Sequence, residues 1–576
     1  MKRFVKYVKG NWLYTIMAPI FMMIDAIGSI VQPFFMAKII DVGIATGDVN
    51  YIVRMGIFMI LIALGTMVSG FLCMYFSAKA AYGFAYNIRR DMMEKIQDFS
   101  FYNINKFKTS SLITRLTNDV LVVSQLFQMM LRIVIRAPFM FIGGTIMALL
   151  LNAKLSLILV VLIPILFIAV LIVLKMVAPL FEKVQKGIDK VNAVIRENLK
   201  GIRVIKSFVR EDYMKERFNN ANDELTDISI KSFGKIIVMM PLVSLVMNLA
   251  VAAIIWFGSI IAGNGGIEVG AISSFISYIM MILSSLIMMS MVFMNFARAK
   301  ASSDRIMEVL EEIPDIRNST KASDKVIKKG DISFNVLDFS FKDATSEEVL
   351  NNVKFDVKAG DMVAIIGGTG SGKSTLVNLI PRFYDVSNGY VKVDGIDVKD
   401  YDIKTLRDSV GFVLQENRLF KGTIKENIKW GKSDATDEEV IHACRVAQID
   451  EFIDSLPDKY ESIVEQKGTN FSGGQRQRLC IARALIKKPK ILILDDSVSA
   501  LDSTTEAKLT RALHEEFKDT TVLIITQRIS SCKKCDYVVV MDNGEVVGIG
   551  PHDELIKDNL VYKEINDSQQ EVLEDA

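Results

Sequence analysis

The chain has 576 residues, of which 51% are hydrophobic and 23% are charged. A soluble globular protein is usually less apolar and a pure membrane bundle carries fewer charges, so the composition excludes both and favours a membrane part joined to a soluble part. The net charge of +2 provides no basic excess that would indicate a nucleic-acid partner. Five scattered cysteines do not form a disulfide framework and fit a reducing compartment.

Apolar runs near the twenty residues that a bilayer requires occupy the first part of the chain. The six runs are 12–40, 52–78, 128–151, 155–178, 236–262 and 270–296. Lys and Arg are frequent in the connections 79–126 and 180–235 and absent from 41–50 and 262–270. Because basic residues favour the cytoplasmic side, we expect a multi-pass protein of the cytoplasmic (inner) membrane, in contact with lipid, with both termini and the soluble part in the cytoplasm.

Several ionisable residues interrupt these apolar runs. Asp25 either faces a water-filled substrate path or pairs with another span, and the sequence leaves both open. Arg132 and Arg136 lie one helical turn apart near the inner end of the third run, where we expect them to snorkel to the interface. The sequence assigns no substrate contact to these residues or to Asp41.

The rest of the chain alternates short β-type runs with helical patterns, which is typical of an α/β domain. A polar stretch precedes it. We therefore expect a six-span membrane domain over 1–310, a linker over 311–329 and an α/β domain over 330–576. The acidic segment 564–576 is expected to be a solvated end.

A glycine-rich motif in the second part fits G-x-x-x-x-G-K-[ST] completely and lies between a predicted buried strand and a helix. Backbone amides of such a P-loop bind phosphate oxygens, the lysine contacts the β- and γ-phosphates, and the hydroxyl at its end ligates Mg²⁺. This predicts a nucleoside triphosphate as the ligand. The nucleotide residues are Gly367, Gly368, Thr369, Gly370, Ser371, Gly372, Lys373, Ser374 and Thr375.

A second buried run, 488–496, ends in Asp495, which we expect to share the Mg²⁺ shell with Ser374. Between the two motifs stands Phe471-Ser472-Gly473-Gly474-Gln475, which resembles the signature of ATP-binding cassette (ABC) proteins. The resemblance implies three further roles. These are Gln415 as the Q-loop residue that contacts Mg²⁺, Asp502 as the D-loop residue in 499–502, and Phe341 as the ring stacked on adenine.

The resemblance covers the whole chain, because six spans followed by one nucleotide-binding domain is the half-transporter layout of ABC exporters. It implies a type I exporter fold, with coupling helices near 104–115 and 208–217 that rest on nucleotide-binding domains. It also implies a second homologous half. ATP would then lie between one P-loop and the signature of the other half, so Ser472, Gly473, Gly474 and Gln475 would act in trans.

Two positions depart from the family pattern. Asp496 stands where a catalytic Glu is usual, and its shorter side chain brings the carboxylate less close to the attacking water. Gln527 stands where the switch His is usual, and Gln has no titratable proton. This pair resembles the degenerate half of heterodimeric ABC exporters, in which hydrolysis occurs mainly at the partner's P-loop.

The sequence thus predicts ATP-driven efflux of amphipathic, drug-like compounds by one half of a heterodimer with an impaired ATP site of its own. Two alternatives stay open. The chain could pair with a copy of itself to give two slow sites, or it could be an ATP-gated channel or membrane regulator.

Overall fold

The computed structural model describes residues 2–319, 325–341, 348–499 and 501–574. It divides into two compact units, each built from two pieces of the chain. The first unit comprises Met1–Gln97 and Ser110–Glu312, and the second comprises Asp98–Thr109 and Ile313–Ala576. The short segment that groups with the second unit lies inside the membrane domain expected from the sequence.

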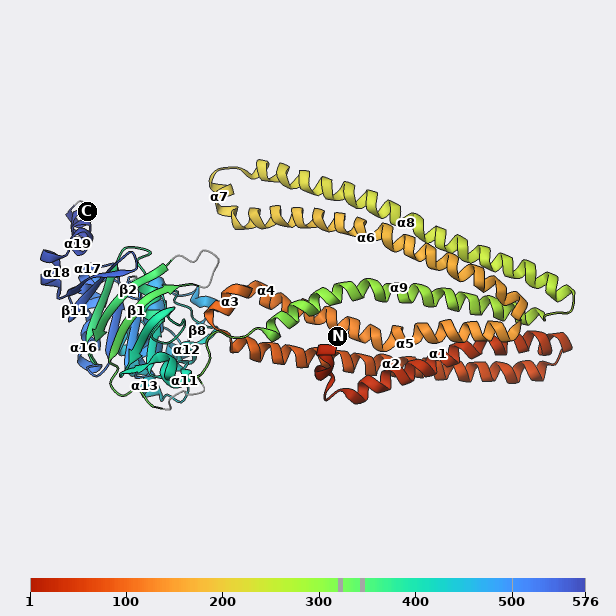
Figure 1. The fold of residues 1–576 in the computed structure, drawn as a ribbon, viewed down its shortest axis with the longest axis horizontal. Helices are drawn as coiled ribbons and strands as arrows, with labels where there is room; N and C mark the ends of the chain where they lie inside the picture. The colour runs from red at the N-terminus through yellow and green to blue at the C-terminus, as the bar shows by residue number, and fades with distance from the viewer. Residues whose placement is uncertain (1, 320–324, 342–347, 500, 575–576) are drawn as a thin grey trace. The chain divides into compact units, whose positions relative to one another are not determined.

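Long helices make up the first unit (Figure 1). Its helices are α1 (Trp12–Lys38), α2 (Val49–Gln97), α4 (Thr109–Thr114), α5 (Val120–Leu151), α6 (Ala153–Lys200), α7 (Ile202–Ser207), α8 (Glu211–Gly263) and α9 (Val269–Glu311). A 3-10 helix η1 (Lys2–Val8) precedes them, and the π-helical segments η2 (Ile39–Ile44) and η3 (Arg115–Asp119) extend α1 and join α4 to α5.

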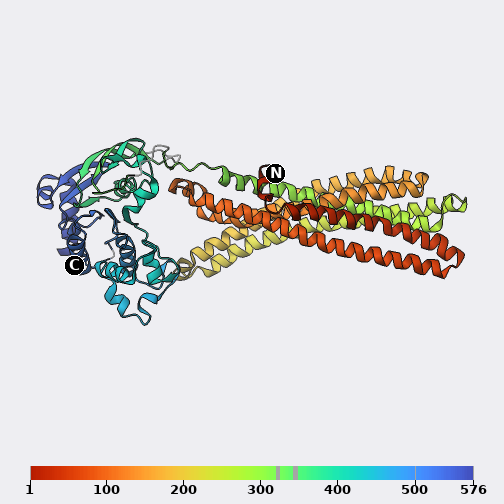
Figure 2. The same ribbon diagram turned by 90° about the horizontal axis from the view of Figure 1, so that it is seen from below.

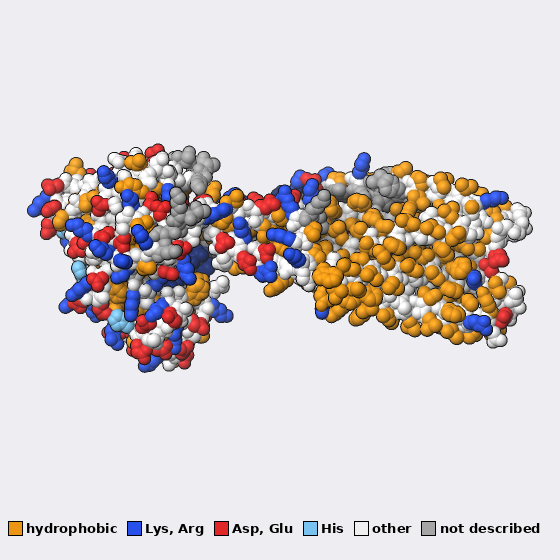
Figure 3. All heavy atoms as spheres, turned by 60° about the horizontal axis from the view of Figure 1, so that its bottom comes forward, with side chains coloured by type: hydrophobic (Ala, Val, Ile, Leu, Met, Phe, Trp, Pro, Cys, Tyr) orange, Lys and Arg blue, Asp and Glu red, His pale blue; other side chains and the backbone are white. Residues whose placement is uncertain are grey.

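In the described residues, five helical segments are long and apolar enough to cross a membrane. They are Trp12–Ile44, Val49–Gln97, Thr109–Leu151, Ser244–Gly263 and Val269–Glu311, and they cover five of the six predicted spans. Helix α6 runs through the sixth, 155–178, where the described apolar stretch is Ala153–Ile165. On the face shown in Figure 3, hydrophobic side chains cover most of this unit and charged side chains gather at its ends.

The interior of the first unit contains an ion pair between α1 and α5. The Asp25 carboxylate is buried, and its Oδ2 lies 3.3 Å from Nη1 of Arg136. Of the two alternatives for Asp25, the structure therefore contains the pairing one. The guanidinium of Arg136 thus contacts α1, and the snorkelling expected for Arg132 and Arg136 stays a prediction. Asp41 accepts a hydrogen bond from the amide of Gly270 at the start of α9.

Helices α6 and α8 form a hairpin joined by α7 (Figure 1 and Figure 2). They pack on each other through a small apolar cluster centred on Val191, Val194 and Ala221. At the α7 end, the hairpin diverges from α9 in both views. The segment 208–217, where a coupling helix was expected, contains the link after α7, which ends at Ser207, and the first turns of α8, which begins at Glu211.

The second unit contains two principal sheets. The four-stranded sheet has the order β2-β1-β4-β5 and is antiparallel; the six-stranded sheet has the order β12-β11-β3-β10-β9-β6, parallel except for its edge strand β12. The strands are β1 (Ile332–Ser340), β2 (Glu348–Val357), β3 (Met362–Gly367), β4 (Asn388–Val393), β5 (Ile396–Asp397), β6 (Val410–Val413), β9 (Ile491–Asp495), β10 (Thr521–Ile525), β11 (Tyr537–Asp542) and β12 (Glu545–Gly550). A separate pair, β7 (Gly422–Thr423) and β8 (Ile463–Val464), completes them.

Alternate residues of the central strands enter different cores, as the period of a strand requires. In β9, Ile491 and Ile493 pack toward the antiparallel sheet, whereas Leu492 and Leu494 pack toward the helices that follow β6. The helices of this unit are α3 (Phe101–Phe107), α10 (Lys373–Asn378), α11 (Ile403–Asp408), α12 (Ile424–Lys429), α13 (Asp437–Val446), α14 (Asp450–Asp454), α15 (Gly473–Leu485), α16 (Ser503–Glu516), α17 (Ile529–Cys532), α18 (His552–Asp558) and α19 (Leu560–Glu574). Three 3-10 helices, η4 (Val398–Asp400), η5 (Lys459–Glu461) and η6 (Gln466–Gly468), lie between them.

Candidate functional site

The parallel strands β3, β10 and β9 are neighbours, and their carboxyl ends lie at one edge of the sheet. Ile525 pairs with both Ile365 and Asp495 in the register of these strands. The residues that follow each strand therefore meet there, which is where open α/β sheets bind ligands. This register brings the P-loop, the acids at 495–496 and Gln527 together.

Gly367 and Gly372 of the P-loop are required for different reasons. A Cβ on Gly367 would lie 2.1 Å from the carbonyl oxygen of Met541, so the loop leaves β3 in close contact with β11. Gly372 has φ +90, a left-handed conformation that disfavours other residues, and a Cβ there would lie 2.6 Å from Leu350. These constraints fix the path of the backbone that carries Lys373.

Lys373 and Ser374 form the polar centre of this loop. The ammonium of Lys373 is buried and donates hydrogen bonds to the carbonyl oxygens of Gly367 and Gly368, at 2.9 and 2.6 Å. Ser374 donates its hydroxyl to Oδ1 of Asp495 at 2.8 Å. Burial lowers the pKa of Lys373 and raises that of Asp495, where the hydrogen bond from Ser374 acts in the opposite direction. Hydroxyl and carboxylate oxygens are ligands that Mg²⁺ prefers, so this pair fits the predicted metal site.

A pocket of about 260 Å³ contains most of the predicted nucleotide residues. Among the described residues that line it are members of the P-loop, the predicted Q-loop residue, the acids at 495 and 496, and the residue at the switch position. The predicted residues that line it are Thr369, Gly370, Gly372, Lys373, Ser374, Thr375, Gln415, Asp495, Asp496 and Gln527. The described lining does not include four other residues predicted to bind the nucleotide, which are Gly367, Gly368, Ser371 and Phe341.

The backbone at Asp496 is held from three sides. Its φ of 48 is left-handed, which is uncommon outside glycine. Its amide donates to the carbonyl of Ile525 at 3.0 Å, and its own carbonyl accepts from Gln477 at 3.2 Å and Ser499 at 2.9 Å. With the backbone fixed in this way, the length of the side chain decides how far the carboxylate reaches into the pocket.

The signature residues begin helix α15. Ser472 is its N-cap and forms a complete capping box with Gln475: Oγ accepts from the Gln475 amide, and the Ser472 amide donates to Oε1 of Gln475 at 2.8 Å. Phe471, where the family usually has Leu, is buried and packs edge-on against Phe452. Gly473 lines a second pocket together with Gln415 and Asp496. The described lining of the P-loop pocket includes none of Ser472–Gln475.

The D-loop residue and the predicted adenine ring have defined surroundings. Asp502 caps α16 by accepting from the amides of Thr504 and Thr505, and hydrogen bonds from Thr505 lower its pKa. Ala500 of the D-loop lies outside the described residues. Phe341 is 38% exposed and lies edge-on to Phe339 and Tyr384, so its role toward adenine stays a prediction.

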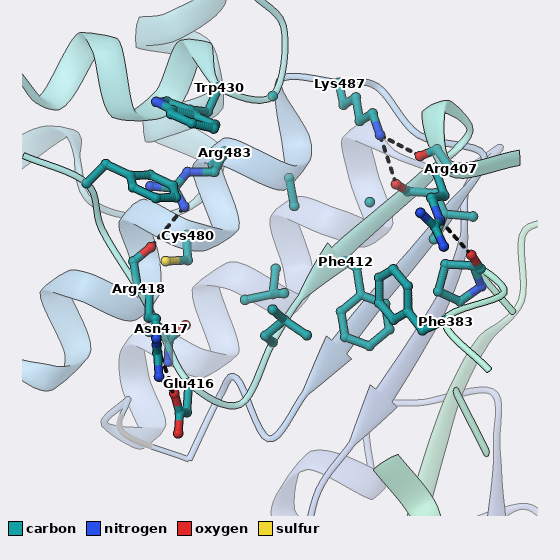
Figure 4. Close-up of a pocket in the computed structure, with 18 of the residues that line it drawn as sticks. Phe383, Arg407, Phe412, Glu416, Asn417, Arg418, Trp430, Cys480, Arg483 and Lys487 are labelled. Atoms are coloured by element: carbon teal, nitrogen blue, oxygen red, sulfur yellow. Dashed lines mark hydrogen bonds and ion pairs between the residues drawn. The ribbon is translucent and has the colours of Figure 1, made fainter. Parts of the chain in front are cut away.

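Helix α3 is part of the second unit and lies beside a groove of about 790 Å³. Figure 4 shows Phe383, Phe412 and Trp430 among the residues that line this groove. Phe101 lies edge-on to Phe383, with ring centroids 4.8 Å apart, and both line the groove. Residues 416–418, which directly follow Gln415, line it too. The groove therefore connects the residues after Gln415 to α3, near which the first coupling helix was predicted. This helix is displaced from the predicted 104–115, because Ser100 caps it at its start and Lys108, with φ 58, ends it.

Two family models match the chain: "ABC transporter transmembrane region" over residues 15–286 and "ABC transporter" over residues 350–499. The chain is 41% identical over 569 residues to the "Uncharacterized ABC transporter ATP-binding protein YfiB" of Bacillus subtilis, covering 99% of this chain and 98% of the relative. It belongs to the ABC transporter family. The "Putative multidrug export ATP-binding/permease protein YgaD" of Bacillus subtilis is 34% identical over 499 residues, with 85% of this chain and 84% of the relative covered.

The ABC transporter shares its fold with a solved structure titled "Structure of a bacterial Atm1-family ABC exporter with ATP bound". The TM-score is 0.81 at 23% identity, covering 96% of this chain and 98% of the other. The predictions of a type I exporter fold, of ATP with Mg²⁺, and of ATP hydrolysis coupled to transport are confirmed. Exporters of this family act as dimers, with either an identical subunit or a second half.

Sequence reasoning missed some residues around the site. Phe101 and Phe383 carry no motif, and only the contact between distant segments identifies them. Two residues around the switch position were also missed. Gln569 bonds the carbonyl of Gln527 and the amide of Ile529, and Arg528 bonds the carbonyls of Ser499 and Leu501. Gln569 lies in the segment that was expected to be a solvated end, whereas the structure continues α19 through it to Glu574.

Proposed function

We propose that the chain is the degenerate half of a heterodimeric exporter that moves amphipathic compounds out of the cytoplasm, with its nucleotide-binding domain on the cytoplasmic side. The observation that carries this proposal is the lining of the P-loop pocket. Lys373, Ser374 and Asp495 are all present for binding, while Asp496 and Gln527 occupy the positions that act in hydrolysis. Binding and hydrolysis therefore depend on separate residues of one pocket.

Of the two departures from the family pattern, the shorter acid at position 496 should slow hydrolysis more. A general base works within about 2.6–3.2 Å of the proton that it accepts. Because hydrogen bonds hold both the amide and the carbonyl of Asp496, the backbone has little freedom to compensate for the missing methylene. Gln527 also provides no titratable group. We expect slow turnover and prolonged retention of ATP at this chain's P-loop.

The residues that would hold Mg²⁺ are suited to this role whatever the rate of ATP hydrolysis. Ser374 and Asp495 would hold Mg²⁺, which when bound would neutralise charge on the phosphates. Lys373 would exchange its contacts to the loop carbonyls for contacts to phosphate oxygens. This chain's intact signature, begun by Ser472, would complete the faster site on the partner's P-loop.

Pairing with a second half is supported by exposed apolar surface near α7. Val204, Phe208 and Val209 are 61%, 73% and 81% exposed. An apolar cluster of this kind commonly marks a protein contact. The groove beside Phe101, lined by Phe412, Val413 and Leu414 among others, provides an apolar surface of matching chemistry. We expect the α7 end of each half to occupy this groove in the other.

Restoring the usual residues tests the impaired site directly. In the purified complex, Asp496→Glu combined with Gln527→His should raise turnover at this chain's P-loop by about 10-fold or more, because a well-placed general base contributes about 10²–10⁴-fold. A photoreactive ATP analogue labelled in its γ-phosphate reports the rate on this chain alone. If both sites of the unmodified complex already hydrolyse ATP equally, the proposal is wrong.

Two further measurements separate the alternatives. Co-purification with a second half that has the usual Glu and His supports the heterodimer, whereas full activity of this chain alone supports a homodimer. Flux of an amphipathic compound against its gradient in proteoliposomes supports a pump. Dissipation of gradients in both directions on adding ATP would instead indicate a gated channel.

A further inference from the structure

The C-terminal helix α19 holds the backbone of the switch segment through one side chain. The amide nitrogen of Gln569 donates to the carbonyl oxygen of Gln527 at 2.6 Å, and its Oε1 accepts from the amide of Ile529 at 3.0 Å. Only one orientation of the side-chain amide satisfies both bonds. The two bonds fix peptide groups on both sides of Arg528, directly after strand β10.

Helix α19 is itself firmly anchored. Tyr562 is fully buried, its hydroxyl lies 2.7 Å from Nδ1 of His552, and Asn566 is also buried. Tyr562 packs in a cluster with Ala364 and Ile366 of β3, the strand that leads into the P-loop. The position of Gln569 is therefore defined relative to the same sheet that carries Lys373.

The switch segment is held from its other side as well. Arg528 donates to the carbonyl oxygens of Ser499 and Leu501, at 2.6 and 3.1 Å, next to the D-loop. Its guanidinium also lies 3.8 Å from the buried carboxylate of Glu506, to which Ser531 donates a hydrogen bond. The segment thus lies between α19 and the D-loop, and the side chain of Gln527 lines the ATP pocket.

We propose that Gln569 is a positioning residue for ATP turnover. By fixing the carbonyl of Gln527 and the amide of Ile529, it sets where the switch side chain stands relative to the reacting phosphate. In the described lining of the ATP pocket Gln569 is absent, so we expect it to affect the rate of turnover and not the affinity for ATP. The inference rests on ATP turnover at this chain's P-loop and holds whether or not the partner half is identical.

The neighbouring residue Gln570 provides a matched control, because it is the same residue type on the same helix but is exposed. In the full complex, Gln569→Leu should lower kcat at this chain's P-loop by about 10-fold while KM for ATP stays within about twofold, since it removes two hydrogen bonds that act on the rate alone. Gln570→Leu should leave both unchanged. Turnover is followed on this chain with the γ-labelled photoreactive analogue and binding with its α-labelled form.

Two truncated chains control for a folding defect caused by Gln569→Leu. Ending the chain after Gln570 keeps both hydrogen bonds, whereas ending it after Ser568 removes them; only the second should slow turnover. Thermal unfolding of each variant should match the unmodified complex. Unchanged kcat in Gln569→Leu, or equal losses of α- and γ-label, would overturn the positioning role. Fast hydrolysis by the unmodified chain would contradict the proposed slow site and leave the comparison of Gln569 with Gln570 valid.

Discussion

The P-loop side and the signature side of the nucleotide-binding domain differ in what they retain. On the P-loop side, Ser374 donates its hydroxyl to Asp495 and Lys373 lines the same pocket, while Asp496 and Gln527 stand where the family pattern predicts Glu and His. On the signature side, Ser472 and Gln475 form a complete capping box at an exposed helix start. Within the pocket, the side chains expected to bind triphosphate are separate from those expected to act in its hydrolysis, so the proposed function predicts that the second set can change while the first is kept.

The largest expected effect tests whether the P-loop side binds ATP. Lys373→Ala should weaken ATP binding at this chain's P-loop by about 10- to 100-fold, because a hydrogen bond to a charged group contributes about 1.5–3 kcal/mol. Labelling with the α-labelled photoreactive analogue measures it. Lys487→Ala is a matched control, since this lysine also donates to two backbone carbonyls of the same domain but lies in the groove. Equal losses in both variants would contradict a specific role for Lys373.

A change on the signature side should affect the other site. Ser472→Ala should lower turnover at the partner's P-loop severalfold and leave ATP binding to this chain unchanged. Loss of the cap should also cost about 1 kcal/mol of stability. Thr436→Ala removes a similar capping box at α13 and controls for this loss. If Thr436→Ala slows the partner's site as much, the effect of Ser472→Ala is one of stability alone.

A third variant tests how both sides communicate with the membrane helices. Phe101→Ala removes an edge-on aromatic pair that contributes about 0.5–1.5 kcal/mol beyond its burial. We expect basal ATP hydrolysis to persist and its stimulation by a transported amphiphile to fall by about 2- to 10-fold. The ratio of the stimulated to the basal rate is the measurement. A ratio equal to that of the unmodified complex would show that α3 does not transmit the signal.

The smallest expected effect concerns the stability of the nucleotide-binding domain and leaves the P-loop and signature residues unchanged. Asp394 accepts hydrogen bonds from four consecutive amides, 328–331, which lower its pKa although burial acts to raise it. A carboxyl whose folded-state pKa is lowered stabilises the fold above its unfolded pKa of about 3.9, and the contribution disappears as the pH falls through the folded pKa.

Asp394→Asn should therefore reduce the free energy of unfolding by about 1 kcal/mol at neutral pH, since the carboxylate is partly exposed and its bonds are screened. The difference between variant and unmodified protein should shrink below about pH 4. Urea unfolding at both pH values measures it. A difference that grows on acidification would contradict the assigned cause.

Residues with short-range patterns were predictable from the sequence. The P-loop, Asp495 and the signature each combine a motif with a predicted strand or helix. The structure brings the first two to one edge of a parallel sheet, whereas the signature begins α15 outside the described lining of the P-loop pocket. The start of α3 at Phe101 was missed because its boundaries depend on a cap at Ser100 and a left-handed Lys108, which dominate over the apolar pattern. The Asp25–Arg136 pair was left open because it joins two helices far apart in the sequence.

The sequence by itself determined the membrane and nucleotide parts and the phosphate-binding motif, because these follow from hydrophobic length and from side-chain chemistry at fixed spacing. The roles of Asp496 and Gln527 in hydrolysis stay predictions. Only the tertiary structure decided which distant groups touch: Phe101 on Phe383, and Gln569 on the backbone beside Gln527. Such contacts arise where separately formed elements pack against one another. Their geometry depends on the paths of whole helices and strands, which no local pattern of residues records.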